Sequence, residues 1–456
     1  TRMPYVSLNP ATGEVLQQFP GFDRARLADT LQQVAAAQPD WAALSFAERG
    51  AYLRRIAHCL LLNRERYAGL ITLEMGKLRR EAIAEVEKSA LVCNFYADEA
   101  ERQLAPQVMP SDASHSYVLY QPLGVLLGVM PWNYPFWQVF RYVAPALMAG
   151  NACVLKHASN VPQCALEIER ICRDAGLPDN IFRTLLIDSA QVAEAIASPH
   201  VQAVTLTGSE AAGRQVAGAA GMAMKKSVLE LGGSDPFIVL ADADLDWAVA
   251  QAVPARFTNA GQSCISAKRF IVVPEIADLF VARLQTEIAR LQCGDPLDDT
   301  TTLAPLARAD LRDELHQQVQ DSIRAGAVPL LGCEPLDGAG AFYAPSLLDR
   351  VQPGMRAYDE EIFGPVALVL RARDEADAIR IANDTRFGLG SSIWSRDLQR
   401  AQAVAARIEA GNAYINSLVK SDPRLPFGGI KASGYGRELS GHGIHEFVNA
   451  KTVWIK

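Results

Sequence analysis

The sequence predicts an α/β protein with a doubly wound parallel sheet, and three observations support this fold class. The chain has 456 residues, which is more than a single hydrophobic core usually serves and suits two or three packed domains. From about residue 150, short apolar runs alternate with helical patterns, as they do in α/β folds. A second alternation of the same kind follows after about residue 253.

The expected elements can be placed in order along the chain. Between about residues 23 and 105, apolar residues recur at three- and four-residue steps, which predicts long helices. Segment 116–130 alternates and is rich in Val, Leu and Tyr, as strands are. The first unit then has expected strands at 152–156, 181–187, 203–207, 228–231 and 237–240, with helices over 160–175, 190–197 and 211–220. The second unit has expected strands near 269–273 and 367–370, helices over 276–292, 308–325 and 374–384, and an edge strand at 447–455.

Composition and charge exclude several classes of protein. About half of the residues are hydrophobic (49%) and 21% are charged, which is typical of a globular protein with a sizeable core. The formal net charge is -7 and the basic residues form no stripe, so neither nucleic acid nor an anionic membrane is an expected partner. The most apolar stretch, 117–137, contains three prolines and is too interrupted to span a membrane.

The eight cysteines favour a reducing compartment. None has C-x-x-C spacing and no histidine cluster lies near them, so we expect no metal site. At this density the cysteines are expected to be free thiols. Because residues 1–6 also lack the apolar segment of a secretory signal, we expect a cytoplasmic protein.

Three residues lie in sequence contexts that are typical of catalytic groups. Cys264 follows Gly-Gln-Ser, a small and turn-forming sequence that predicts an accessible loop; the alternative is an ordinary core cysteine. Glu230 lies inside an apolar strand, where burial would raise its pKa and suit a general base. The alternative for Glu230 is a pair with Lys225 or Lys226. Asn133 lies between prolines on a turn and could donate to an oxyanion, or could simply bond its own backbone.

These residues belong to motifs that resemble those of the aldehyde dehydrogenase superfamily, and the resemblance runs from about residue 5 to the end. The motifs are Pro-Trp-Asn-Tyr-Pro at 131–135, Leu-Glu-Leu-Gly-Gly at 229–233, Gly-Gln-Ser-Cys at 261–264, Glu-Glu-Ile-Phe-Gly-Pro at 360–365 and Pro-Phe-Gly-Gly-Ile-Lys at 426–431. Five motifs in the order and spacing of that family form a specific signal.

The resemblance implies a fold and a domain organisation. It implies a Rossmann-like cofactor domain, an α/β catalytic domain and a small β oligomerisation flap. The dinucleotide-binding domain would comprise residues 1–115 and 141–252, and the catalytic domain residues 253–425. The flap would comprise residues 116–140 and 426–456. We therefore expect a homodimer or a homotetramer.

The resemblance also implies roles for the catalytic residues. Cys264 would be the nucleophile, which adds to the aldehyde to form a thiohemiacetal and then a thioester. Glu230 would activate Cys264 or the hydrolytic water. Asn133 and the backbone N–H of Cys264 would form the oxyanion hole, and Glu438 would assist proton relay.

The cofactor site can be expected from residues on several loops. Segment 207–213 follows a strand and opens a helix, so Gly208, Ser209 and Gly213 could meet a pyrophosphate, although the segment is not G-x-G-x-x-G. Lys156 and Ser159 offer a cation and a hydroxyl that suit a 2′-phosphate, which favours NADP while leaving NAD possible; alternatively, Ser159 only caps the next helix. By resemblance, the remaining cofactor contacts would be Trp132, Leu231, Glu361, which would hold the nicotinamide ribose, and Phe363 beside it.

The expected substrate is an aldehyde that carries a carboxylate. Arg141 lies among apolar residues and requires an anion; the alternative is an acid from a neighbouring element. The resemblance is greatest to bacterial succinate-semialdehyde dehydrogenases, in which an arginine at this offset and a serine, here Ser421, grip the substrate carboxylate. Two positions depart from some relatives: Thr258 replaces a second arginine, and Ser266 replaces a cysteine that forms a redox switch. The competing functions are a broad-specificity aldehyde dehydrogenase, a cofactor-independent esterase and a non-catalytic protein on the same scaffold.

Overall fold

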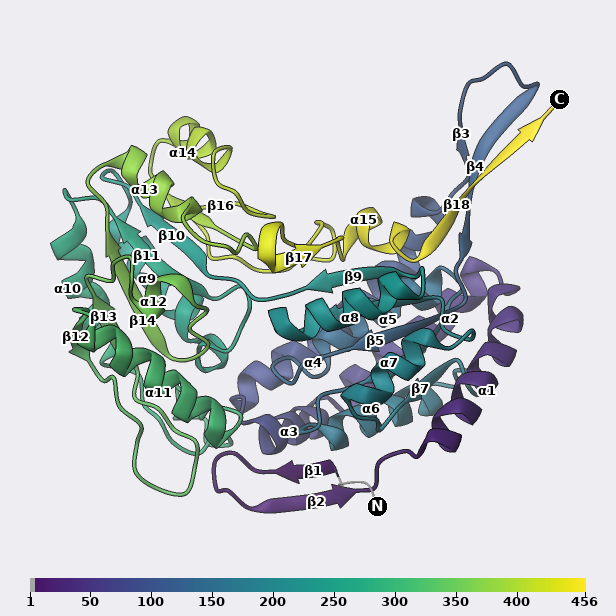
Figure 1. The fold of residues 1–456 in the computed structure, drawn as a ribbon, viewed down its shortest axis with the longest axis horizontal. Helices are drawn as coiled ribbons and strands as arrows, with labels where there is room; N and C mark the ends of the chain where they lie inside the picture. Colours follow the sequence, from purple (N-terminus) through teal and green to yellow (C-terminus); the bar gives the residue numbers. More distant parts are fainter. Residues whose placement is uncertain (1–4) are drawn as a thin grey trace.

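The structure is a computed structural model that describes residues 5–456 (Figure 1). The first four residues, which contribute to the expectation about a secretory signal, lie outside the described residues. A hairpin of β1 (Tyr5–Leu8) and β2 (Val15–Phe19) is followed by the predicted long helices. These are α1 (Arg24–Ala42), α2 (Phe46–Leu62), α3 (Arg64–Met75) and α4 (Arg79–Gln103).

The first large sheet has six strands in the order β17-β9-β8-β5-β6-β7. Its parallel strands are β5 (Val125–Val129), β6 (Ala152–Lys156), β7 (Phe182–Thr184), β8 (Ala203–Thr207) and β9 (Lys226–Glu230), and β17 (Gly434–Tyr435) pairs antiparallel with β9. The helices that connect or flank them are α5 (Trp137–Met148), α6 (Pro162–Asp174), α7 (Ser189–Ala197) and α8 (Glu210–Met222). Strand order reverses beside β5, and such a reversal places a ligand-binding crevice at the carboxyl ends of the strands.

The second large sheet has seven strands in the order β12-β13-β14-β11-β10-β15-β16. They are β10 (Asp235–Val239), β11 (Ala267–Val272), β12 (Val328–Leu331), β13 (Ser346–Asp349), β14 (Val366–Arg371), β15 (Ser392–Trp394) and β16 (Tyr414–Ile415). The helices of this region are α9 (Leu245–Phe257), α10 (Ala277–Ile288), α11 (Ala309–Arg324), α12 (Arg356–Asp359), α13 (Glu375–Asn383) and α14 (Leu398–Ala405). Each large sheet has its own hydrophobic core, which agrees with the predicted α/β class.

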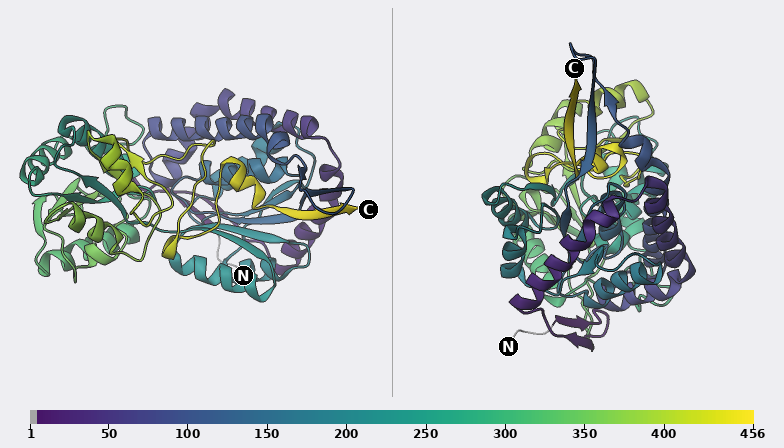
Figure 2. Two further views of the ribbon diagram at one scale, coloured as in Figure 1. Left: turned by 90° about the horizontal axis from the view of Figure 1, so that it is seen from above. Right: turned by 90° about the vertical axis from the view of Figure 1, so that its right-hand side faces the viewer.

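A third, three-stranded sheet projects from the body (Figure 2). It consists of β3 (Gln107–Val108), β4 (His115–Pro122) and β18 (Val448–Ile455), with β18 as one edge. The short helix α15 (Ser440–His445) precedes β18. The expected strand at 447–455 is therefore present, and its exposed residues include Trp454 and Ile455.

The sheets divide the chain differently from the predicted domain boundaries at three places. Val125–Val129, which we assigned to the flap, is the central strand β5 of the first sheet. The strand is buried on both faces along most of its length, as strands inside a parallel sheet are, whereas most residues of β4 are half-buried. Gly434–Tyr435 was also assigned to the flap but extends the first sheet, and Asp235–Val239 was assigned to the cofactor domain but belongs to the second sheet.

Two features bear on what the chain can bind. In the part of the chain that the structure describes, no helix has both the length and the apolarity needed to cross a bilayer. Over the same residues, no group of three or more His, Cys, Asp or Glu side chains could hold a metal ion.

Candidate active site

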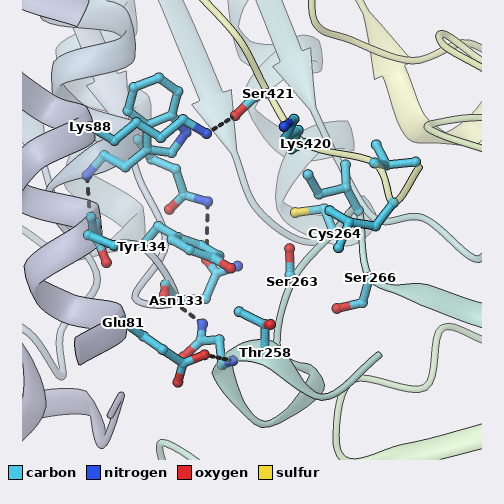
Figure 3. Close-up of a pocket in the computed structure, with 18 of the residues that line it drawn as sticks. Glu81, Lys88, Asn133, Tyr134, Thr258, Ser263, Cys264, Ser266, Lys420 and Ser421 are labelled. Atoms are coloured by element: carbon cyan, nitrogen blue, oxygen red, sulfur yellow. Dashed lines mark hydrogen bonds between the residues drawn. The ribbon is translucent and has the colours of Figure 1, made fainter. Parts of the chain in front are cut away.

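A cavity of about 320 Å³ opens between the two large sheets and brings four predicted residues together (Figure 3). Its lining includes Asn133, Arg141, Cys264 and Ser421. Apolar residues form much of the wall between them: Trp137, Pro254, Ile265, Leu418, Val419 and Phe427. The cavity is therefore an apolar channel with polar groups at a few defined points, as is usual for small-molecule sites.

Cys264 lies on the loop between the short helix η1 (Thr258–Gly261) and β11. The chain turns sharply just before this loop, because Asn259 and Ala260 of η1 both have positive φ, at 56° and 54°. The thiol lines the cavity, so the alternative of a core cysteine does not describe it. Burial raises the pKa of Cys264 to about 11, and the Glu361 carboxylate contributes in the same direction, whereas Lys268 opposes it.

A buried lysine holds the backbone on both sides of this loop residue. Lys268 Nζ donates to the carbonyl oxygens of Ser263 and Cys264 at 2.9 and 3.0 Å. The same ammonium pairs with Glu361 at 3.2 Å, and Glu361 also accepts from the Gly233 N–H at 2.8 Å. The ion pair thus connects the Cys264 loop to the Gly-Gly segment that links the two large sheets.

Asn133 lies on the loop after β5, at the point where the strand order reverses. Its side-chain nitrogen donates to Gln262 O at 3.3 Å, and its side-chain oxygen accepts from Gln138 at 3.2 Å. These partners fix the amide orientation and leave the second amide hydrogen available. Within the described residues the Cys264 N–H donates to no protein acceptor, so both predicted oxyanion donors are available at one cavity.

Helix α4 supplies a carboxylate to each of these two loops. Glu81 accepts from the Asn259 N–H at 2.8 Å, on the Cys264 side. One turn later, Glu85 accepts from the N–H groups of Phe136 and Trp137 at 2.8 and 3.1 Å, at the start of α5. A carboxylate at a helix N-terminus satisfies free N–H groups and interacts favourably with the helix dipole. The pair therefore aligns the Asn133 loop with the Cys264 loop.

Glu230, Arg141 and Glu438 form a buried cluster. Arg141 pairs with Glu438 at 2.9 Å and donates to Thr207 at 2.8 Å. The acid that we considered as an alternative partner for Arg141 is thus present, and it is the residue for which the resemblance implied proton relay. Neither Lys225 nor Lys226 contacts Glu230, because Lys225 donates to backbone carbonyls and Lys226 pairs with Glu446.

Glu230 is buried at the end of β9, and its carboxyl oxygens accept no hydrogen bond from the described residues. Burial raises the pKa of Glu230 well above its usual range, and the neighbouring Glu438 raises it further. The carboxyl group does not line the cavity itself. As a general base, Glu230 would have to act through water or after a change of side-chain rotamer.

The predicted cofactor residues gather at the carboxyl ends of β5, β6, β8 and β9. Lys156 ends β6, and Ser159 is exposed on the loop that follows it. Ser159 does not cap α6, because the helix begins at Pro162 without a side-chain cap. At the next loop Gly208 precedes Ser209, which caps α8 by accepting from the Ala212 N–H at 3.2 Å.

Two further groups complete this edge of the sheet. Gly213 packs against Leu231: a Cβ at position 213 would come within 2.5 Å of that side chain, so the glycine permits close packing of helix on strand. Trp132 and Phe363 meet edge to face with ring centroids 5.9 Å apart, beside Glu361. The edge presents the N-terminus of α8, the exposed Ser159 hydroxyl and the Lys156 cation, which are groups that can meet a dinucleotide phosphate.

Comparison with known proteins places the chain in a family. A profile of the aldehyde dehydrogenase family matches residues 2–453. The chain belongs to the aldehyde dehydrogenase family. The chain is 52% identical over 453 residues to the protein named "Probable succinate-semialdehyde dehydrogenase (NADP(+))" of Synechocystis sp., covering 99% of this chain and 100% of that protein.

Other members of this family are similar along their whole length. Succinate-semialdehyde dehydrogenase (NADP(+)) 1 of Mycobacterium ulcerans is 48% identical, with 99% of this chain and 100% of that protein covered. The crystal structure of succinic semialdehyde dehydrogenase from Streptococcus pyogenes, in complex with NADP+, superimposes with a TM-score of 0.97 at 40% identity, covering 99% of each chain. The aldehyde dehydrogenase fold that the motifs implied is thus confirmed.

Sequence reasoning missed several residues of this aldehyde dehydrogenase site. Lys268 and Arg269 lie together in the buried strand β11, a signal comparable to the one that identified Glu230. Glu81, Glu85 and Lys88 gave no comparable signal, since charged residues three and four apart on a helix usually mark a solvated face. Only their contacts across the cavity distinguish them.

Proposed function

We propose that this enzyme oxidises succinic semialdehyde to succinate with NADP as the hydride acceptor. The observation that carries the proposal is the composition of the cavity: a thiol and two oxyanion donors share an apolar channel with Arg141, Lys88 and Ser421. Positive charge beside an apolar channel favours a substrate with a carboxylate beyond the reacting aldehyde. The names of the relatives in Synechocystis and Mycobacterium support the same substrate and cofactor.

The residues divide the reaction into two stages. Glu230, acting through water, takes the proton of the Cys264 thiol, and the thiolate adds to the aldehyde carbon. The Asn133 amide and the Cys264 N–H stabilise the negative oxygen that forms. When bound, NADP+ accepts the hydride, and the carbon is left as a thioester on Cys264. Water then attacks the thioester; Glu230 takes a proton from that water, and succinate and the free thiol are released.

The proposed roles of the remaining residues follow from their surroundings. Lys156 forms no ion pair in the described part of the chain, and Ser159 is exposed, so both can meet a 2′-phosphate. Glu361, Trp132 and Phe363 would hold the nicotinamide half. Glu438 pairs with Arg141, so its effect on proton relay would be exerted through that pair.

Assembly and compartment are also part of the proposal. The exposed edge of β18 offers unpaired backbone groups that a second copy could cover, which supports a homodimer or homotetramer. The eight cysteines are free, as they are in proteins of reducing compartments such as the cytoplasm.

The test compares NADPH formation from succinic semialdehyde and from butanal, which lacks the carboxylate. A charge-assisted contact contributes about 1.5–3 kcal/mol, so we expect a roughly 10- to 100-fold preference in kcat/KM for succinic semialdehyde. Cys264→Ser should reduce both reactions by at least about 10³-fold. Cys293→Ser is the matched control, because burial also raises the pKa of that thiol to about 11 but it lies outside the cavity.

A broad-specificity aldehyde dehydrogenase is the second candidate, since the apolar wall would accept an alkyl chain. Equal kcat/KM for the two aldehydes would contradict the semialdehyde assignment and support this alternative. Product formation without nicotinamide would instead indicate an esterase.

A further inference from the structure

The wall of the cavity contains a lysine held in a defined position. Lys88 projects from α4, and its ammonium lies 4.3 Å from the ring centroid of Trp137. The ammonium also donates to Ser421 Oγ at 2.5 Å, across the cavity from α4 (Figure 3). An aromatic face and a hydroxyl orient the charge without neutralising it.

No carboxylate of the described residues forms an ion pair with Lys88. The two acids that act on it electrostatically already have partners. Glu85 pairs with Lys77, and Asp422 pairs with Arg424 at 2.7 Å. The other charged neighbours, Arg141 and Lys420, are cations. The ammonium therefore faces the cavity as an uncompensated positive charge.

Arg141 lines the same cavity but differs in this respect. Its guanidinium pairs with Glu438, and both side chains are almost completely buried, at 4% and 1% exposure. A cation that already has a buried anionic partner gains less from a second anion than a cation that has none.

We propose that Lys88, together with Ser421, binds the substrate carboxylate. The charge of Lys88 contributes more to the preference for this substrate than the charge of Arg141 does. The proposal rests on the proposed function, and it adds Lys88 to Arg141 and Ser421 as a specificity-determining residue. The apolar residues between Cys264 and Lys88 would contact the methylene groups of the substrate. The ligand class is a short aliphatic aldehyde with a terminal carboxylate.

The test uses the full-length enzyme with Lys88→Met, Lys88→Arg and the control Arg64→Met. Methionine keeps an unbranched stem against Trp137 and removes the charge. Arg64 is exposed and forms no ion pair among the described residues, so its substitution removes one positive charge without touching the cavity. Each variant is assayed with succinic semialdehyde and with butanal.

Lys88→Met should raise KM for succinic semialdehyde about 10- to 100-fold, change kcat little, and leave butanal oxidation unchanged. Lys88→Arg should bring KM for succinic semialdehyde most of the way back to the wild-type value. Arg64→Met should have the wild-type KM and kcat for both aldehydes. If Lys88→Met retains the wild-type preference for succinic semialdehyde, the proposal for Lys88 is overturned while the proposed function stands. If the wild type shows no preference, the proposed function itself is wrong.

A second measurement needs no variant and covers the case in which Lys88→Met fails to fold. Burial, helped by Arg141 and Lys420 and opposed by Glu85 and Asp422, lowers the pKa of Lys88 to about 8. The side chain is charged below that pH and loses its charge above it. KM for succinic semialdehyde should therefore rise above about pH 8 while KM for butanal does not, and parallel profiles would overturn the proposal.

Discussion

Two kinds of charged group surround the cavity, and they differ in whether their charge is compensated. On the side of the large sheets, Arg141 and Glu438 form a buried ion pair, and the buried Lys268 pairs with the half-buried Glu361. Lys88, on the α4 side, meets a hydroxyl and an aromatic ring instead of an acid. Compensated charges hold loops and strands in place, whereas an uncompensated one remains available to a ligand. A basic residue that lines a site is therefore not by itself evidence of anion binding.

The largest expected effect is a loss of folding stability when the Arg141–Glu438 ion pair is broken. Arg141→Gln leaves Glu438 buried beside Glu230, and loss of one partner of a buried pair costs about 3–5 kcal/mol. Glu438→Gln added to Arg141→Gln should recover most of this loss. Urea unfolding of the single and double variants measures the free energy of unfolding.

The pH dependence of that loss provides a check. Arg141 lowers the pKa of Glu438, which burial raises, so its removal should let Glu438 take up a proton more readily. The difference in the free energy of unfolding between the wild type and Arg141→Gln should then shrink as the pH falls and Glu438 becomes neutral. A double variant as unstable as the single one would show that Arg141 acts through packing and not through charge.

An intermediate effect, on the reactivity of the Cys264 thiol, is expected at the Lys268–Glu361 pair. Because the Cys264 pKa is raised to about 11, iodoacetamide alkylation of the wild type should accelerate about tenfold per pH unit between roughly pH 7 and 10. Lys268→Met removes a cation that lowers this pKa, so alkylation at a fixed pH should slow by about tenfold.

The control for this prediction removes both charges. Glu361 raises the pKa of Cys264, so Lys268→Met with Glu361→Gln should alkylate at a rate closer to that of the wild type. If Lys268→Met alkylates at the wild-type rate, the lysine holds the loop carbonyls without influencing the thiol.

The smallest effect, on KM for succinic semialdehyde, is expected at Ser421, which contacts the uncompensated Lys88. Ser421→Ala removes a hydroxyl that contacts Lys88 and lines the cavity, and one hydrogen bond contributes about 0.5–1.5 kcal/mol net. KM for succinic semialdehyde should rise about two- to tenfold, with butanal unaffected. Equal increases for both aldehydes would indicate a change in cavity shape instead.

The sequence predicted most of the local structure. The strands and helices that the sequence placed, including the edge strand at 447–455, lie within a few residues of their predicted positions, because apolar periodicity is a property of neighbouring residues. The buried strands β13 and β15 and the helices α9 and α14 were not predicted. The boundary errors at β5 and β10 have one cause. Hydrogen bonding between strands decides which sheet a strand joins, and periodicity carries no information about the partner.

The candidate site was predicted unevenly. Cys264, Asn133, Arg141 and Ser421, which the sequence singled out, line one cavity, and Glu230 lies close by without lining it. Arg141 and Glu438 were both named, but for separate tasks, and their ion pair was not predicted. Lys88 was missed because its position on an amphipathic helix is equally typical of a solvated charge.

By itself, the sequence determined the fold class, the family and the loops on which the candidate reactive groups lie. Only the tertiary structure decided which charges neutralise one another and which remain available. The reason is physical: the energy of an ion depends on its distance to other charges and on its exposure to water. Both quantities arise when α4, α5 and the 418–421 loop meet around one cavity.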